Sequence, residues 1–139
     1  MPPKGSTSIS LWSGHAKAIE DYAKSLPYPP TTPQMVKRAV SLKIPVKKLL
    51  GSPTVRAAVR TISEADEEGV ILRSVTMPDE VAKALADMAK DAKDDIMSLL
   101  EMAKEPSPTY CAGLLVLLFI ETESPGFLAK QKKELLAAE

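Results

Sequence analysis

Cysteine is almost absent from this chain of 139 residues, which contains Cys111 alone. A single cysteine cannot close an internal disulfide, so the sequence excludes the cross-linked framework of a small secreted domain. No signal peptide is predicted either, because residues 1–8 combine Gly, Ser, Thr, Lys and Pro without an apolar segment. We therefore expect a soluble intracellular protein, located in the cytoplasm, with residues 1–8 as a flexible tail.

A long hydrophobic run is lacking too. The most apolar segment extends from Tyr110 to Ile120, and Glu121 and Glu123 follow it closely. A membrane-spanning helix needs about 20 apolar residues, so no membrane span is predicted. The segment instead predicts a helix over about residues 108–121 that is apolar on every side and therefore buried at the centre of the fold.

Motifs for cofactor binding or catalysis are absent. The sequence has no phosphate-binding loop of the G-x-x-x-x-G-K-S/T or G-x-G-x-x-G kind, no G-x-S-x-G turn and no H-E-x-x-H zinc motif. We therefore predict a non-enzymatic protein with no catalytic residue, no cofactor and no metal ion. A small helical enzyme using His15 or Cys111 is an alternative, but the apolar neighbours of both residues favour structural roles.

One cluster of carboxylates occurs, at Asp87, Asp91, Asp94 and Asp95. Spacings of three and four residues on a helix suit oxygen ligation of a hard cation. Three lysines between residues 83 and 93 interleave with these acids, however. The pattern therefore favours a solvated, salt-bridged face over a metal site.

Acidic residues are absent between Asp21 and Glu64, and this is the most informative gap in the chain. The 18 Lys and Arg balance the 18 Asp and Glu overall. Residues 22–63 nevertheless carry eight bases and no acid (+8), whereas residues 64–106 carry twelve acids and five bases (−7). Such asymmetry indicates a charged partner, or contact between surfaces of opposite charge.

The periodicity of the apolar residues predicts an all-α fold, an irregular bundle of six to seven helices around the buried helix at 108–121. We expect a single helical domain over residues 9–139. Its helices are predicted at 9–26, 33–42, 45–50 and 52–68, followed by a long acidic helix at 78–105, the buried helix at 108–121 and a C-terminal helix at 125–138. The basic part of the domain, residues 22–63, overlaps the first four of these helices.

Four Ser/Thr-Pro pairs predict helix starts, because the hydroxyl caps a free amide and proline fits the first turn. They are Thr32-Pro33, Ser52-Pro53, Ser107-Pro108 and Ser124-Pro125. Residues 69–75 are rich in β-branched side chains, but a lone strand would have no partner. An extended connector is therefore predicted there.

The basic segment is the main candidate for a binding surface, because phosphate binding requires several Lys and Arg on one surface with no acids among them. The candidate residues for binding nucleic acid or an acidic protein are Lys37, Arg38, Lys43, Lys47, Lys48, Arg56 and Arg60. The candidate acidic face, through which copies would meet head-to-tail in a homo-oligomer, consists of Glu80, Asp87, Asp91, Asp94 and Glu101. The sequence thus predicts a binding or self-assembly module, comparable to small structural proteins such as viral nucleocapsid proteins.

Residues 46–59 also resemble a helix-turn-helix, with a short helix, a glycine turn and Ser-x-Thr-Val-Arg near the start of a second helix. The resemblance implies a DNA-binding regulator with Thr54, Arg56 and Arg60 near the DNA groove. The turn is about two residues shorter than in that family, and a lysine replaces the alanine expected in the first helix. Residues 71–81 similarly resemble the strand and helix start of a ribbon-helix-helix protein.

Overall fold

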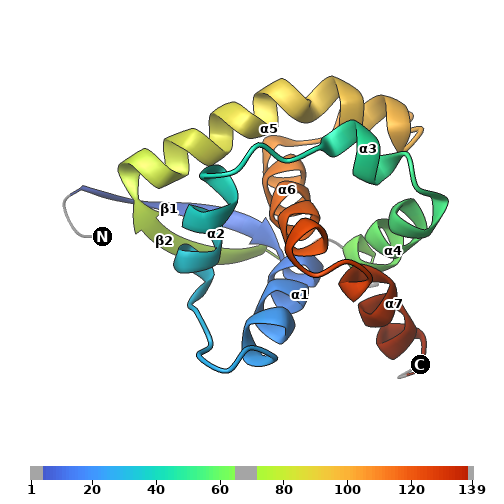
Figure 1. Cartoon of the computed structure of the whole chain (residues 1–139). Helices are drawn as coiled ribbons and strands as arrows, with labels where there is room; N and C mark the ends of the chain where they lie inside the picture. The colour runs from blue at the N-terminus through green and yellow to red at the C-terminus, as the bar shows by residue number, and fades with distance from the viewer. Residues whose placement is uncertain (1–4, 65–71, 138–139) are drawn as a thin grey trace.

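The structure, a computed structural model, describes residues 5–64 and 72–137 (Figure 1). Over these residues the chain is mainly helical, with seven helices and one two-stranded sheet. In chain order the elements are β1 (Ser6–Trp12), α1 (Ser13–Lys24), α2 (Thr32–Val40), α3 (Val46–Leu50), α4 (Pro53–Ser63), β2 (Leu72–Pro78), α5 (Asp79–Leu99), α6 (Pro108–Glu123) and α7 (Phe127–Ala137).

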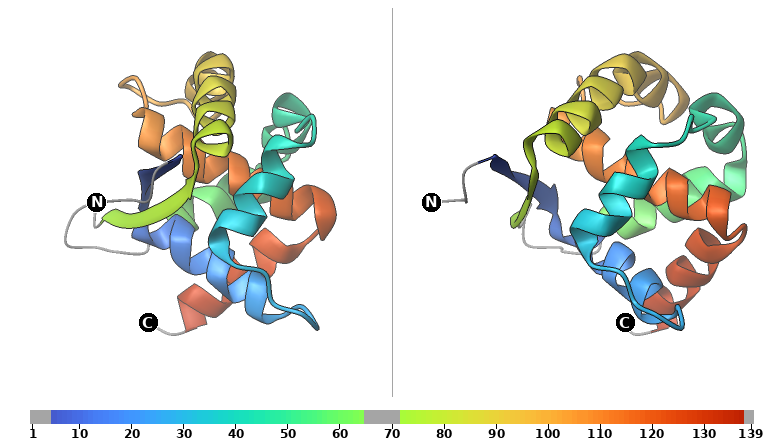
Figure 2. Two further views of the ribbon diagram at one scale, coloured as in Figure 1. Left: turned by 90° about the vertical axis from the view of Figure 1, so that its left-hand side faces the viewer. Right: turned by 60° about the vertical axis from the view of Figure 1, so that its left-hand side comes forward.

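The two strands form an antiparallel ribbon in which Ser6 lies opposite Pro78 and Trp12 opposite Leu72. Leu11 and Met77 are buried in the core and Ile9 and Val75 are partly buried against it, whereas Ser8, Ser10, Ser74 and Thr76 beside them are exposed. This alternation is that of a strand with one face on the core. The ribbon lies at one side of the helices, with α5 against it (Figure 2).

The ribbon shows that the all-α prediction is wrong. Residues 6–8, predicted as part of a flexible tail, belong to β1, and residues 72–75, predicted as part of a connector, belong to β2. Residues 1–4 of the predicted tail and 69–71 of the predicted connector lie outside the described residues. Four helices separate the two strands in the chain, so no local pattern identified the partner of either one.

Two of the predicted helix starts are confirmed at the predicted residue. The side chain of Ser52 accepts a hydrogen bond from the amide of Val55 at 3.4 Å, and that of Ser107 from the amide of Tyr110 at 3.1 Å. In each case the hydroxyl satisfies an amide that has no partner within the helix.

The other two helix starts differ from the prediction. At α2, Thr31 rather than Thr32 is the N-cap, because it forms a reciprocal capping box with Gln34. At α7, the helix begins at Phe127, beyond the predicted Ser-Pro start. The reason is the buried carboxylate of Glu121, which accepts hydrogen bonds from two backbone amides at the beginning of this helix, at 2.7 and 3.1 Å.

The long helix α5 ends at Leu99, six residues before the end of the predicted helix at 78–105. The amide of Met102 donates to the carbonyl of Met97 at 2.9 Å, and Glu101 has a left-handed backbone with φ of 53°. This arrangement is a Schellman motif, which normally has glycine at the left-handed position. Because glutamate occupies it here, the sequence contained no stop signal.

Two further helices are shorter than predicted. α1 begins at Ser13 instead of residue 9, because residues 9–12 belong to β1. The helix predicted over 52–68 corresponds to α4, which ends at Ser63. The remainder of that prediction, residues 65–68, lies outside the described residues.

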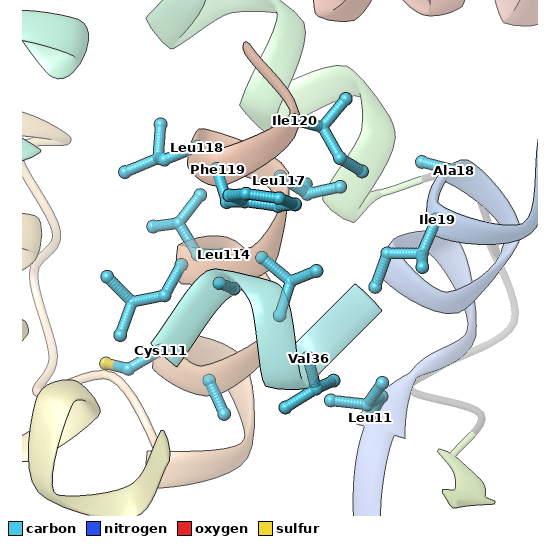
Figure 3. Packing of buried hydrophobic residues seen from close by; sticks show 14 of the residues in the cluster. Leu11, Ala18, Ile19, Val36, Cys111, Leu114, Leu117, Leu118, Phe119 and Ile120 are labelled. Atoms are coloured by element: carbon cyan, nitrogen blue, oxygen red, sulfur yellow. The ribbon is translucent and has the colours of Figure 1, made fainter. Parts of the chain in front are cut away.

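Helix α6 is the most buried element, because every residue from Tyr110 to Glu121 is inaccessible or nearly so. It contacts β1, α1, α2, α3, α5 and α7. Figure 3 shows its leucines and Phe119 packed among side chains from other elements, including Ile19 and Val36. One cluster of buried side chains therefore joins the strands and all seven helices.

Candidate functional site

Helix α2 presents the first part of the basic segment to solvent. Met35, Val36 and Ala39 are fully buried, whereas Lys37 and Arg38 are exposed. Apolar side chains three and four residues apart share one face of a helix, so the two cations project from the opposite face.

The connection after α2, together with α3, adds three more exposed cations, Lys43, Lys47 and Lys48. α3 is anchored by Leu50, which is fully buried. α2 and α3 follow one another along the same side of the molecule (Figure 2). The structure thus brings five of the seven predicted basic residues to one region of the surface.

No candidate cation is neutralised by an ion pair in the part of the chain that the structure describes. The ion pairs found there join Lys17 to Asp21, Arg73 to Glu20, and Lys93 to Glu105. The charges of the five exposed cations are therefore directed to solvent. Solvated cations of this kind are available to an external anion.

Arg56 and Arg60 bind backbone instead. The guanidinium of Arg56 donates to the carbonyl of Leu50 at 2.8 Å, and that of Arg60 donates to the carbonyl of Leu100 at 3.0 Å. These carbonyls lie at the ends of α3 and α5, where a positive charge also complements the helix dipole. The two arginines of the helix-turn-helix interpretation thus stabilise helix ends in the isolated chain.

A groove runs beside the exposed cations, and we call it the basic groove. Its first part, about 1020 Å³, is lined by Tyr28, Pro29, Pro30, Gln34, Lys37, Arg38, Ser41, Leu42, Phe119 and Glu123. Its second part, about 740 Å³, is lined by residues 40–48 together with Met88, Asp91, Ala92, Asp95 and Leu115. Ser41 and Leu42 line both parts, so the two parts adjoin past the end of α2.

Sequence reasoning missed the apolar side chains of the groove. Tyr28 is 91% exposed and Leu42 is 50% exposed. The prolines around Tyr28 are typical of an extended linker, which gave no reason to expect a binding side chain there. A tyrosine in a proline-rich segment without apolar periodicity was the signal that could have revealed it.

Acidic residues are also present in the basic groove. Asp91 and Asp95 of α5 lie in the same part of the groove as the lysines of α3, and Glu123 lines the first part. All five predicted acidic-face residues are exposed, but Glu101 follows the end of α5 and does not lie on it. Asp95 and Glu123 were not in the predicted set.

Among the described residues, no group of three or more His, Cys, Asp and Glu is placed to hold a metal ion.

His15 is completely buried and lines neither part of the groove. Its Nε2 forms a hydrogen bond of 2.8 Å with the hydroxyl of Ser63, while Nδ1 has no partner among the described residues. Its ring stacks on Trp12 with a centroid distance of 5.8 Å and lies 5.3 Å from the ring of Tyr110. Burial lowers the pKa of His15 to about 4, so the imidazole is neutral at physiological pH.

Gly113 of α6 packs directly against this imidazole. A Cβ atom at this position would overlap Nδ1 of His15 and lie 2.9 Å from its Cγ atom. Glycine at this point of an apolar helix therefore makes room for the ring. The predicted position of His15 on an apolar face is confirmed.

Cys111 is buried at the beginning of α6, with 1% of its surface exposed. Burial raises the pKa of its thiol to about 11, so the thiolate that would act as a nucleophile is not formed near neutral pH.

No single helix among the described residues is long and apolar enough to cross a membrane, and α6 and α7 meet that test only when taken together across a bend of 114°. No protein-family model matches the chain, and no significantly similar curated protein or solved structure was found.

Proposed function

We propose that this chain is a binding module that holds a polyanion, in the first place nucleic acid, along the basic groove. The observation that carries the proposal is the series of exposed cations on α2, α3 and their connection, with no ion pair to any of them within residues 5–64 and 72–137. A nucleic acid gains affinity from each cation that displaces a condensed counterion from its phosphates.

The acidic residues of the basic groove restrict where a polyanionic ligand can lie. The lining residues include five cations and three acids, Asp91, Asp95 and Glu123. A polyanion would follow α2 and α3 and avoid the wall formed by α5. Replacing Asp91 and Asp95 by asparagine is therefore expected to tighten binding, because it removes repulsion between like charges.

The test is a titration of a fluorescently labelled RNA oligonucleotide, measured by anisotropy at several salt concentrations. The groove variant carries Lys47→Glu and Lys48→Glu. The matched control carries Lys132→Glu and Lys133→Glu, two consecutive lysines on α7 that do not line the groove. Both variants change the net charge of the protein by the same amount.

We expect the wild type to bind at low salt and to lose affinity linearly on logarithmic axes, with a slope of about −0.7 per phosphate neutralised on a single strand. The groove variant should lose about 1.4 from the magnitude of this slope, since two contacts are removed. The control should keep the wild-type slope. Absence of binding at low salt contradicts the proposal, and an equal loss in both variants shows that net charge alone drives binding.

Self-association is a second candidate, favoured by the exposed acidic residues of α5. Glu80, Asp87, Asp91 and Asp94 are all exposed, at spacings that place them along one side of the helix. A head-to-tail contact between this face and the basic groove of another copy would build a ring or a filament, as in a nucleocapsid-type assembly.

Light scattering at two salt concentrations, with and without RNA, tests the second candidate. Oligomers that dissociate at high salt, and that the groove variant fails to form, would support it. A monomer at every protein concentration and at both salt concentrations contradicts it.

A further inference from the structure

Tyr28 is the most exposed large hydrophobic side chain among the described residues, with 91% of its surface accessible. It stands in the segment Pro27-Tyr28-Pro29-Pro30, where the proline rings fix the backbone φ angle. The aromatic ring is thus presented to solvent on a stiff backbone. Binding through this ring would cost little additional conformational entropy.

The ring lies beside cations of the basic groove. Tyr28, Lys37 and Arg38 line the same part of it, and both cations are exposed. Leu42, which is half exposed, adds apolar surface where the two parts of the groove meet. An aromatic ring and cations in one groove are the combination by which proteins bind single strands, since bases stack on the ring and phosphates contact the cations.

A duplex does not suit this combination. Its base pairs are stacked on one another, so the faces of the bases are not accessible to a side chain at the surface. An acidic peptide would satisfy the cations, but its Asp and Glu side chains offer no aromatic face for the tyrosine ring. The exposed ring therefore favours a polyanion whose planar bases are accessible for stacking.

We infer that the ligand of the basic groove is single-stranded nucleic acid, with a base stacked on Tyr28 and neighbouring phosphates on Lys37 and Arg38. This inference rests on the proposed function and adds the strandedness of the ligand and the residue that recognises it. The lysines of α3 would contact the continuing backbone of the same strand.

The experiment compares a labelled oligouridine with a duplex RNA of the same length in an anisotropy titration. The variants are Tyr28→Ala and Tyr28→Phe. The matched control is Leu136→Ala, which removes another exposed apolar side chain, 49% accessible, from α7 outside the groove. Inorganic polyphosphate, which has charge but no bases, serves as an unlabelled competitor.

We expect Tyr28→Ala to weaken oligouridine binding about 5- to 140-fold, the range found for one base stacked on an aromatic ring. The salt slope should remain that of the wild type, because no phosphate contact is lost. Tyr28→Phe and Leu136→Ala should bind like the wild type. The duplex should bind more weakly, and Tyr28→Ala should leave its affinity unchanged.

Two results overturn the inference while leaving the proposed function intact. One is equal affinity of the wild type and Tyr28→Ala for oligouridine, and the other is equal affinity of the wild type for duplex and single strand. If neither oligouridine nor duplex binds at low salt, the proposed function fails as well. Circular dichroism of each variant verifies that a loss of binding does not arise from unfolding.

Discussion

Substitution of Gly113 by alanine tests the packing of α6 against the buried histidine. A Cβ atom there would overlap Nδ1 of His15 and lie 2.9 Å from Cγ and 3.0 Å from Cβ of the same residue. The imidazole has no room to retreat, because it is stacked on Trp12, tilted against Tyr110 and hydrogen-bonded to Ser63. The added methyl group must therefore displace either the ring or α6.

Two effects of this substitution oppose each other. Overpacking of a core costs about 1–3 kcal/mol, and contact with three atoms of one fixed side chain places this case near 3 kcal/mol. Alanine also favours the helix over glycine by about 1 kcal/mol. We therefore expect Gly113→Ala to lower the free energy of unfolding by about 2 kcal/mol.

In the His15→Ala background, Gly113→Ala should have the opposite effect on the free energy of unfolding. Without the imidazole the clash disappears, so Gly113→Ala should raise the free energy of unfolding by about 1 kcal/mol. The coupling energy between the two positions is then about 3 kcal/mol. Urea unfolding of the four proteins at pH 7, followed by circular dichroism, measures it. Additivity to within about 0.5 kcal/mol would refute the contact.

Four further measurements test the remaining features. Burial lowers the pKa of His15 from 6.5 to about 4, so only the unfolded chain takes up this proton between those pH values. The contribution of the neutral ring to the free energy of unfolding is complete above pH 6.5 and falls by up to about 3 kcal/mol toward pH 4. Urea unfolding should show a smaller decline over this pH range in His15→Ala than in the wild type. Glu101→Gly should raise the free energy of unfolding by about 1 kcal/mol in the same assay, because the residue has a φ of 53°, whereas Glu101→Ala should give no such gain. Glu121→Gln should lower it by about 1–3 kcal/mol, since two backbone amides lose a charged acceptor, and Glu123→Gln, at an exposed position, should lower it less. Cys111, with a pKa of about 11, should react with a disulfide reagent slowly in the native protein and rapidly in urea; fast reaction of the native protein would contradict its burial.

The sequence predicted those features that depend on neighbouring residues. Ser52 and Ser107 begin helices as expected, because capping involves only the next three residues. The buried faces of α2, α4 and α5 follow from spacings of three and four. The burial of His15 and Cys111 followed from their apolar neighbours.

Features that depend on distant parts of the chain were not predictable in the same way. β1 and β2 have four helices between them, and each strand lacks a partner until the chain has folded. The start of α7 depends on Glu121, which lies in another helix. The second part of the basic groove exists because α5 lies close to α3. A search for basic residues alone therefore did not identify Asp91 and Asp95, which line it.

The place of α6 in the chain has a consequence for synthesis on the ribosome. This helix contacts six other elements, five of which precede it in the chain. The faces of those earlier elements that α6 covers remain exposed until α6 has emerged, and β1 has no strand partner until β2 has emerged. Long-range contacts of this kind delay folding and leave nascent chains prone to aggregation. The protein is therefore expected to fold late and cooperatively, once α6 has been synthesised.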